Sequence, residues 1–353
     1  MAFRSKMLIS TSIIAAALAT TSFVESASAQ APTKSVVLNI ASLGGQLDKV
    51  FKKAFAPFEQ EKGITIRWNP SVSAENLAKV VATKANPEFD VALVENLSHS
   101  IGSARGLWAT VDEKVVTNYA DLYPQARPKN NDGVGIGFFL AGLFYRSDEF
   151  QKRGWAAPTS WEDLFRPEFC GLIGLQHPNV SYTIHTIIML AGGDPNRAEK
   201  GIERLAKLKD CIPVLEPSAP KLEEKIQLGE YLVGIHGNIR TVYLIKQGAP
   251  VKFTYPKEGT VAAVTIAAPV KNAKNATLAQ EFINWYIRPD VQKQIMEGLY
   301  YGPTNRKVEI SAEMKSLGVP DSELMKKMIT VDDSVIVDKR RDWVRQIERA
   351  LAR

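Results

Sequence analysis

The sequence predicts an α/β protein with two lobes, each containing a parallel or mixed sheet flanked by helices. Three observations support this fold class. Apolar runs of strand length alternate with amphipathic helical segments along most of the chain. A glycine-dense, extended run at 133–140 interrupts the alternation, and a second alternating region follows it. The chain has 353 residues, which is enough for about two domains.

The first region has the order strand, helix, strand, helix, strand. We expect strands at 35–41, 64–68 and 89–94 and helices at 47–62 and 73–84. In the first helix, apolar residues recur at the spacing of one helical face and Gly63 follows the last turn. This order implies right-handed crossovers and a mostly parallel sheet.

The second region repeats this alternation after the strand at 143–146. We expect helices at 161–165, 196–209 and 221–228, a helix that ends at Leu190, and strands at 171–175, 212–215 and 232–236. A β-branched strand at 261–268 and helices at 278–286 and 291–297 follow, and the tail at 334–351 is predicted to be a charged helix.

The N-terminus predicts export. Arg4 and Lys6 precede a short apolar segment of small residues, and Ala27-Ser28-Ala29 matches the A-x-A pattern cut by signal peptidase. We therefore expect residues 1–29 to be a signal peptide that is removed. The apolar segment is too short for a stable membrane span, and no cysteine follows the cut to carry a lipid anchor.

The two cysteines, Cys170 and Cys211, both belong to the mature chain. In an oxidising compartment such a pair is most simply a disulfide, and two buried thiols are the alternative. Neither cysteine has a neighbouring base that would indicate a nucleophile.

Composition and motifs exclude several classes. The net charge of +6 comes from dispersed residues, which indicates a solvated surface and no nucleic-acid partner. The four histidines lack metal-ligand spacing, so we expect no metal. The sequence contains no G-x-S-x-G and no P-loop, and Gly135-Ile136-Gly137 lacks the third glycine of a dinucleotide fingerprint. We expect no cofactor, no catalytic residues and no enzyme activity.

Several motifs occur together in one order along the chain. Ala41-Ser42-Leu43-Gly44-Gly45 follows the first strand, and Phe89-Asp90-Val91-Ala92-Leu93-Val94 forms the third. Pro158-Thr159-Ser160-Trp161-Glu162-Asp163-Leu164 precedes Phe169-Cys170-Gly171-Leu172-Ile173-Gly174. Later come Gly248-Ala249-Pro250-Val251, Tyr255-Pro256-Lys257-Glu258-Gly259, Arg288-Pro289-Asp290-Val291-Gln292 and Gly302-Pro303-Thr304-Asn305. In this order the chain resembles the spermidine/putrescine-type branch of the type II periplasmic solute-binding proteins, which serve ABC importers.

The resemblance implies two α/β lobes joined by two crossing strands, with a ligand cleft between them. The extended crossing near Gly137 and the return near Gly259 agree with it. We expect lobe I to comprise 30–142 plus 259–304, and lobe II to comprise 143–258 plus 305–353. The resemblance also implies a monomeric periplasmic receptor that hands a small solute to a permease in the inner membrane. A secreted enzyme on the same fold, or a sensor with a membrane partner, is the alternative.

The loops at the carboxyl ends of the strands supply the candidate ligand contacts. Backbone N–H groups at Ser42, Gly44 and Gly45 can receive an anion at the start of the first helix. Glu95 and Asn96 follow the third strand, and Glu95 can take an ammonium group. The remaining candidates are polar or aromatic residues on later loops: Ser181, Tyr182, Asn238, Arg240 and Tyr301.

These candidates predict a ligand that carries both a carboxylate and an amine, such as a γ-aminobutyrate-like compound, another amino-acid derivative or an opine. Arg240 suits the carboxylate. Polyamine binders of the family carry an aromatic and an acidic residue after the P-K-E-G motif, whereas this chain has neither at 260–265. Polyamine binding is therefore the alternative. Ferric-ion binding through Tyr300-Tyr301 is another, although this pair lies where the hinge is expected.

Overall fold

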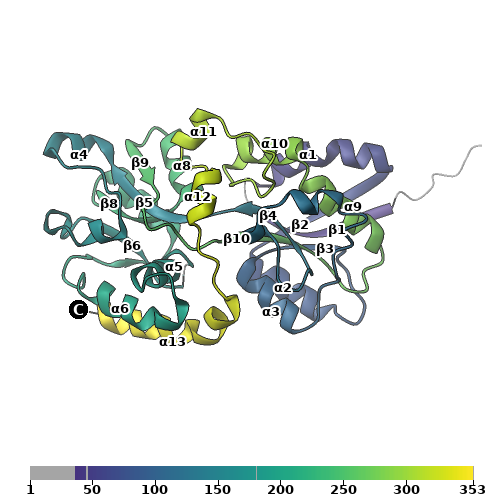
Figure 1. Ribbon diagram of the computed structural model, residues 1–353, viewed down its shortest axis with the longest axis horizontal. Coiled ribbons are helices and arrows are strands. Elements are labelled where there is room, and N and C mark those ends of the chain that lie inside the picture. The colour runs from purple at the N-terminus through teal and green to yellow at the C-terminus, as the bar shows by residue number, and fades with distance from the viewer. Residues whose placement is uncertain (1–35, 45–46, 180, 353) are drawn as a thin grey trace, which may run out of the picture. The chain divides into compact units, whose positions relative to one another are not determined.

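Two five-stranded sheets organise the described part of the computed structural model, residues 36–44, 47–179 and 181–352 (Figure 1). The first sheet has the order β2-β1-β3-β10-β4. β1 is parallel to β2 and β3, while β10 is antiparallel to both β3 and β4. The strands are β1 (Val36–Leu43), β2 (Ile64–Ser71), β3 (Val91–Glu95), β4 (Val134–Phe138) and β10 (Val264–Pro269).

The second sheet has the order β7-β6-β8-β5-β9. β6 is parallel to β7 and β8, and β5 is antiparallel to β8 and β9. The strands are β5 (Ala141–Arg146), β6 (Ile173–Gln176), β7 (Leu215–Glu216), β8 (Val233–Gly237) and β9 (Val251–Thr254). We call each sheet with its covering helices a half of the molecule.

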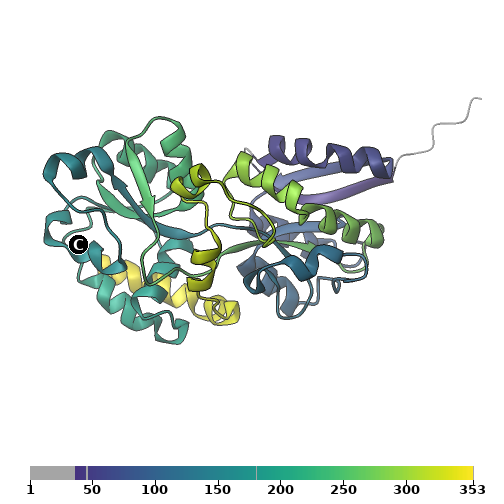
Figure 2. The same cartoon turned by 45° about the horizontal axis from the view of Figure 1, so that its top comes forward.

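Helices cover both sheets. Those of the first half are α1 (Leu47–Lys62), α2 (Ser73–Ala82), α3 (Asn96–Ala104), α9 (Ala276–Tyr286) and α10 (Pro289–Leu299), with 3-10 turns η1 (Thr117–Asp121) and η2 (Pro124–Ala126). Those of the second half are α4 (Ser147–Arg153), α5 (Ser181–Leu190), α6 (Ala198–Ala206), α7 (Ala219–Leu228), α8 (Asn238–Lys246) and the long α13 (Asp333–Leu351), with 3-10 turns η3 (Trp161–Phe165), η4 (Pro167–Phe169) and η5 (Pro195–Arg197). The short helices α11 (Ala312–Ser316) and α12 (Ser322–Lys327) lie between the halves in the ribbon (Figures 1 and 2).

The chain passes between the sheets more than once. It leaves the first sheet after β4, enters the second at β5, and returns from β9 to β10. It passes into the second half again near Ile329, because Met325 and Met328 pack in the first core whereas Ile336 and Trp343 pack in the second. The segment after Asn305 therefore contributes to both cores.

Most predicted elements are confirmed, and the differences have physical reasons. The first sheet is mixed, since β10 arrives from the second half and runs antiparallel between β3 and β4. The first strand is longer than the predicted 35–41: β1 continues to Leu43 because it pairs with β2 through Ser71. The predicted helix at 161–165 is a 3-10 turn that begins with a capping box at Ser160. β9 and the helices α3, α4, α11 and α12 were not predicted.

The disulfide prediction is confirmed. Cys170 and Cys211 are bonded across a sequence separation of 41 residues. The Gly171 N–H also donates a hydrogen bond of 2.9 Å to the Cys211 carbonyl, so the backbone is paired at the same point. The bond joins the segment before β6 to the segment after α6, both in the second half. The signal peptide predicted at 1–29 lies outside the described residues, as does Gly45.

Candidate solute-binding site

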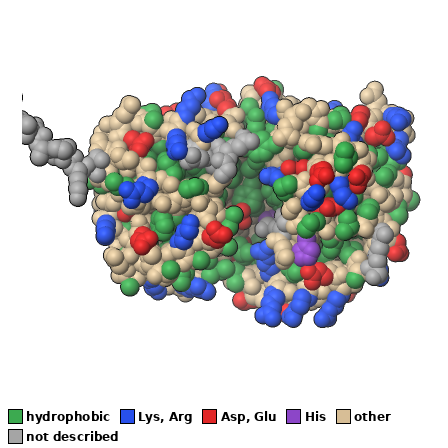
Figure 3. Space-filling model, turned by 180° about the vertical axis from the view of Figure 1, so that it is seen from behind, with side chains coloured by type: hydrophobic (Ala, Val, Ile, Leu, Met, Phe, Trp, Pro, Cys, Tyr) green, Lys and Arg blue, Asp and Glu red, His purple; other side chains and the backbone are tan. Residues whose placement is uncertain are grey.

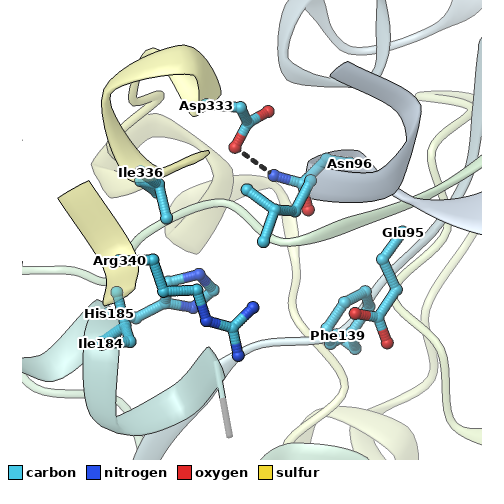
Figure 4. Close-up of a pocket in the computed structure, with 9 residues that line it drawn as sticks. Glu95, Asn96, Phe139, Ile184, His185, Asp333, Ile336 and Arg340 are labelled. Carbon is cyan, nitrogen blue, oxygen red and sulfur yellow. Dashed lines mark hydrogen bonds between the residues drawn. The ribbon is translucent and has the colours of Figure 1, made fainter. Parts of the chain in front are cut away.

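A pocket opens where the carboxyl end of β3 faces α5 and α13 (Figure 4). About 340 Å³ of space free of protein atoms, open solvent included, lies within the outline of this pocket. Its lining comes from both halves and from the crossing segment: Glu95, Asn96, Leu97, Phe139, Ile184, His185, Asp333, Ile336 and Arg340. Seen from behind, a hollow partly lined by hydrophobic side chains lies between the two halves (Figure 3). We call the space defined by these nine residues the inner pocket.

Glu95 is the acidic group that the first half contributes. It is the last residue of β3, where its N–H donates a 2.9 Å hydrogen bond to the Ser73 hydroxyl. Burial raises the pKa of its carboxyl above the ordinary value, and the charge of Arg340 partly opposes this rise. The sheet end thus directs a carboxylate into a poorly solvated space, where a cationic group would stabilise it.

Two tyrosines lie near Glu95 and pack against glycines. A Cβ on Gly237 would lie 2.2 Å from the Tyr182 hydroxyl, and a Cβ on Gly137 would lie 2.8 Å from the Tyr301 ring. Burial, followed by the negative charge of Glu95, raises the pKa of the Tyr182 hydroxyl. Burial raises the pKa of Tyr301 to about 12, and Thr265 beside its hydroxyl partly lowers it. Both rings therefore remain neutral walls of the cleft.

Arg340 is the basic group of the inner pocket, and α13 supplies it. Its guanidinium donates a hydrogen bond to the Asn179 carbonyl in the loop before α5. Burial lowers the pKa of Arg340, and the charge of Glu95 raises it. The two side chains project into the pocket from opposite walls (Figure 4). Both belong to the described part of the chain, and no ion pair joins them.

His185 lies beside Arg340 on the wall formed by α5 (Figure 4). Its side chain is buried, and its Nδ1 has no hydrogen-bond partner among the described residues. Burial, followed by the positive charge of Arg340, lowers the pKa of the imidazole to about 4. His185 is therefore neutral at physiological pH.

Asn96 and Asp333 close one side of the inner pocket. The Asn96 amide donates a 2.5 Å hydrogen bond to the Asp333 carboxylate, which links α3 to the start of α13. Burial raises the pKa of Asp333 to about 6, although the bond to Asn96 favours the charged form. A wider groove on the other side shares these two residues with the inner pocket. The contact therefore separates the two spaces.

Arg240, the predicted carboxylate ligand, has a partner within the protein. Its Nε lies 2.6 Å from Glu223 Oε1, and His236 Nε2 lies 3.2 Å from the same oxygen. Arg240 also lowers the pKa of Tyr182 through its charge, which places it near the cleft. Its positive charge is, however, compensated before any solute binds.

The structure brings only some of the predicted site residues together. Glu95, Asn96, Tyr182, Arg240 and Tyr301 lie in or beside the region where the halves meet. The Ser181 side chain lies outside what is described.

The other predicted residues make structural hydrogen bonds. The Gly44 N–H donates to the Ser71 carbonyl, and the Ser42 carbonyl accepts from the Asn76 amide. The amide of Asn238 accepts from the Leu140 N–H and donates to the Gly318 carbonyl.

Sequence reasoning missed Phe139, His185, Asp333 and Arg340. Phe139 belongs to the glycine-dense run that was assigned only a crossing role. Arg340 and Asp333 lie in the tail helix that was described as charged. The available signal was that Ile336, Trp343 and Ile347 give this helix a buried face. A buried face means that its polar flank meets another part of the protein.

Two kinds of feature are absent from the described residues. No group of three or more histidine, cysteine, aspartate or glutamate side chains there could hold a metal ion. None of the helices in the same residues has the length and apolarity needed to cross a membrane.

Fold and pocket define a class of protein. Two mixed α/β halves with charged groups converging from both are the architecture of the type II periplasmic binding proteins. The chain matches the family described as bacterial extracellular solute-binding protein over residues 53–319 and belongs to it.

Relatives and solved structures agree with this assignment. The chain is 25% identical over 294 residues to the spermidine/putrescine-binding periplasmic protein of Escherichia coli, covering 76% of this chain and 80% of that protein. It is 25% identical over 292 residues to the gamma-aminobutyric acid-binding protein of Pseudomonas aeruginosa, covering 79% and 80%.

A spermidine/putrescine ABC transporter substrate-binding protein from Streptococcus pneumoniae has a similar structure, with a TM-score of 0.76 and 18% identity over 90% of this chain and all of that one. An ABC transporter structure from Clostridium perfringens gives a TM-score of 0.77 with 21% identity, covering 90% and 99%. At these identities the structures support the fold alone.

Proposed function

We propose that this protein captures a small organic solute carrying both an ammonium and a carboxylate group and delivers it to an ABC permease. One observation carries the proposal: Glu95 and Arg340 line the same pocket with opposite charges, and no ion pair joins these two described side chains. A zwitterionic solute neutralises both groups at once. Such compensation offsets the cost of keeping two partly buried charges apart.

Glu95 is the ammonium site. Burial raises the pKa of its carboxyl, so a cation bound beside the carboxylate gains a strong charge-assisted contact. The rings of Phe139 and Tyr182 lie 6.5 Å apart in an edge-to-face arrangement beside it. Aromatic rings attract an alkylammonium group, which offsets part of the hydration that the group loses on binding.

Relatives with printed ligands point in two directions. The Pseudomonas relative is named for γ-aminobutyric acid, which carries both charges, while the Escherichia coli relative is named for spermidine and putrescine, which carry only positive charges. At about a quarter identity, neither name decides the ligand of this chain.

A polyamine is the second candidate, and a specific observation favours it. Asp333 lines the inner pocket together with Glu95, so two carboxylates face the same space. A diamine would need both to be charged, and the pKa of Asp333, raised to about 6, permits this at neutral pH. Arg340 opposes a diamine, because its charge repels the second ammonium.

The test is a comparison of matched ligands. Isothermal titration calorimetry measures binding of 4-aminobutyrate, 1,4-diaminobutane and butyrate to the wild type and to Glu95→Gln. The proposal requires that wild type prefers 4-aminobutyrate and that Glu95→Gln weakens it at least tenfold, since a hydrogen bond to a charged group contributes about 1.5–3 kcal/mol. Preference for the diamine, with no binding of aminocarboxylates, would show that the polarity assigned to the ligand is wrong.

We also infer export, with cleavage between Ala29 and Gln30, and a monomeric receptor in the periplasm. The curated relatives are periplasmic proteins, which supports the compartment. The division into lobe I (30–142 plus 259–304) and lobe II (143–258 plus 305–353) stays a proposal. Met325 and Met328 pack in the first core, which favours a final crossing near residue 329 over one at 305. Native mass spectrometry of protein recovered from the periplasm checks the cleavage and the oligomeric state together.

A further inference from the structure

We infer that Arg340 of the C-terminal helix, backed by His185, forms the anion-binding end of the solute pocket and makes it select aminocarboxylates over diamines. This inference rests on the proposed function and names the residues that carry its specificity. It replaces Arg240, the arginine that the strand-end loops suggest.

Arg240 is a poor anion site because the protein already neutralises it. Glu223 Oε1 lies 2.6 Å from its Nε, and the same oxygen lies 3.2 Å from His236 Nε2. A solute carboxylate at Arg240 would have to displace Glu223 or remain beside it. In either arrangement one of the two carboxylates lacks a full set of hydrogen-bond donors, which weakens binding.

Arg340 is available for a solute. The hydrogen bond to the Asn179 carbonyl uses one of the five N–H donors of the guanidinium. That bond orients the group without neutralising it, since a carbonyl carries no charge. The remaining planar edge faces the inner pocket, opposite Glu95 (Figure 4). A guanidinium edge can bind both oxygens of a carboxylate.

His185 is the second group at this end. It is a buried side chain, only 5% exposed, and its Nδ1 has no partner among the described residues. Buried polar atoms in proteins are normally hydrogen-bonded, so an unpartnered one on a pocket wall indicates a missing partner. A solute carboxylate held by Arg340 comes close to this imidazole, which stays neutral and can donate one hydrogen bond.

The position of Arg340 is preset by the anchoring of α13. Trp343, Ile347 and Leu351 bury one face of the helix in the second core. The Trp343 indole donates a 3.2 Å hydrogen bond to Glu199 at the start of α6. At its other end, Asp333 contacts Asn96 of the first half. The helix is therefore held at both ends, with Arg340 between them and directed at the pocket.

The experiment measures the dissociation constants of 4-aminobutyrate and 1,4-diaminobutane by calorimetry for the wild type and three variants. Arg340→Met removes the charge and keeps the length of the side chain. Arg240→Met tests the rival arginine. Arg341→Met is the matched control, because Arg341 is an exposed neighbour on the same helix.

We expect Arg340→Met to weaken 4-aminobutyrate at least tenfold and to leave 1,4-diaminobutane unchanged or bound more tightly. Arg240→Met and Arg341→Met should change either constant less than threefold. Loss of 4-aminobutyrate binding in Arg240→Met but not in Arg340→Met overturns the inference and leaves the proposed function intact. A wild type that binds only the diamine overturns the proposed function itself.

Partial unfolding of Arg340→Met would lower both affinities together, so the ratio of the two constants is the deciding value. Arg340→Lys gives a second measurement if Arg340→Met does not fold. It keeps the positive charge but loses the planar edge, and we expect an intermediate ratio. If the ratio of the two dissociation constants in both Arg340→Lys and His185→Gln equals that of the wild type, these two residues do not hold a carboxylate.

Discussion

The two sheets share one arrangement of strands but are stabilised in different ways. In each, three parallel strands are followed by an antiparallel fourth strand and by a fifth that is antiparallel to the fourth. In the first half the fourth strand is β10, which returns late in the chain, and in the second half it is β5, which comes first. The same architecture is therefore reached from opposite directions along the sequence.

The first half is stabilised by a cluster of aromatic rings. Phe282 packs against Phe55 with ring centroids 4.5 Å apart, and Trp68 and Tyr286 surround the pair. The second half has a disulfide, and it places the buried imidazoles of His185 and His236 near the cleft. The second half also has an aromatic cluster around Phe150 and Phe169, so the disulfide is the covalent difference between the two halves.

Loss of an aromatic ring from the first core has the largest expected effect. Phe282 is fully buried, and Phe282→Ala removes the ring that contacts Phe55, Trp68 and Tyr286. We expect a loss of about 3–5 kcal/mol, because a buried cavity is left behind. Urea denaturation of the ligand-free protein measures it. Exposed Leu228→Ala is the control, and an equal loss in both variants would contradict the importance assigned to the ring cluster.

Removal of the disulfide should come next. The double variant Cys170→Ser/Cys211→Ser opens a loop of 41 residues. We expect a loss of about 2–4 kcal/mol, since the bond restricts the unfolded chain. Hydrogen exchange should rise in β6 and β8 more than in β1 and β3. Equal protection of both sheets would mean that the bond stabilises the whole molecule and not one half.

A pH effect from His185 should be smaller. Its folded pKa of about 4 lies below the ordinary value of 6.5, so the unfolded chain binds the proton more readily between these values. Stability contributed by His185 is therefore present above pH 6.5 and is lost as pH falls toward 4, by about 2–3 kcal/mol. His185→Gln should lose less stability than the wild type between pH 7 and pH 4.5. Parallel denaturation curves at both pH values would contradict this assignment.

Asp333 should show the smallest effect, with the opposite sign. Its folded pKa of about 6 lies above the ordinary value of 3.8, so the charged form is disfavoured in the folded protein. Stability is consequently lost as pH rises through 6. Asp333→Asn keeps an acceptor for Asn96 and avoids the buried charge, so it should be more stable than the wild type by about 1–2 kcal/mol at pH 7.5, and by less at pH 5. Thermal melts at the two pH values measure this difference.

Local patterns along the chain were sufficient for much of the fold. The apolar face of α1, the glycine after it and the apolar strands β1, β3 and β8 are all encoded within short windows. The disulfide was predictable too, because two cysteines in a chain predicted to be exported have one possible pairing. Glu95 followed from the rule that ligands bind beyond the carboxyl ends of strands.

Tertiary structure alone decided which charges remain available in the site. Arg240 is neutralised by Glu223 from another helix. Arg340 faces Glu95 across the pocket, although the two residues are far apart in the sequence. The same holds for β10, whose position between β3 and β4 depends on a chain that returns from the other half. The sequence determined the elements because helix and strand formation depends on neighbouring residues. It could not determine the site, because the pairing and desolvation of a charge depend on groups that only folding brings near it.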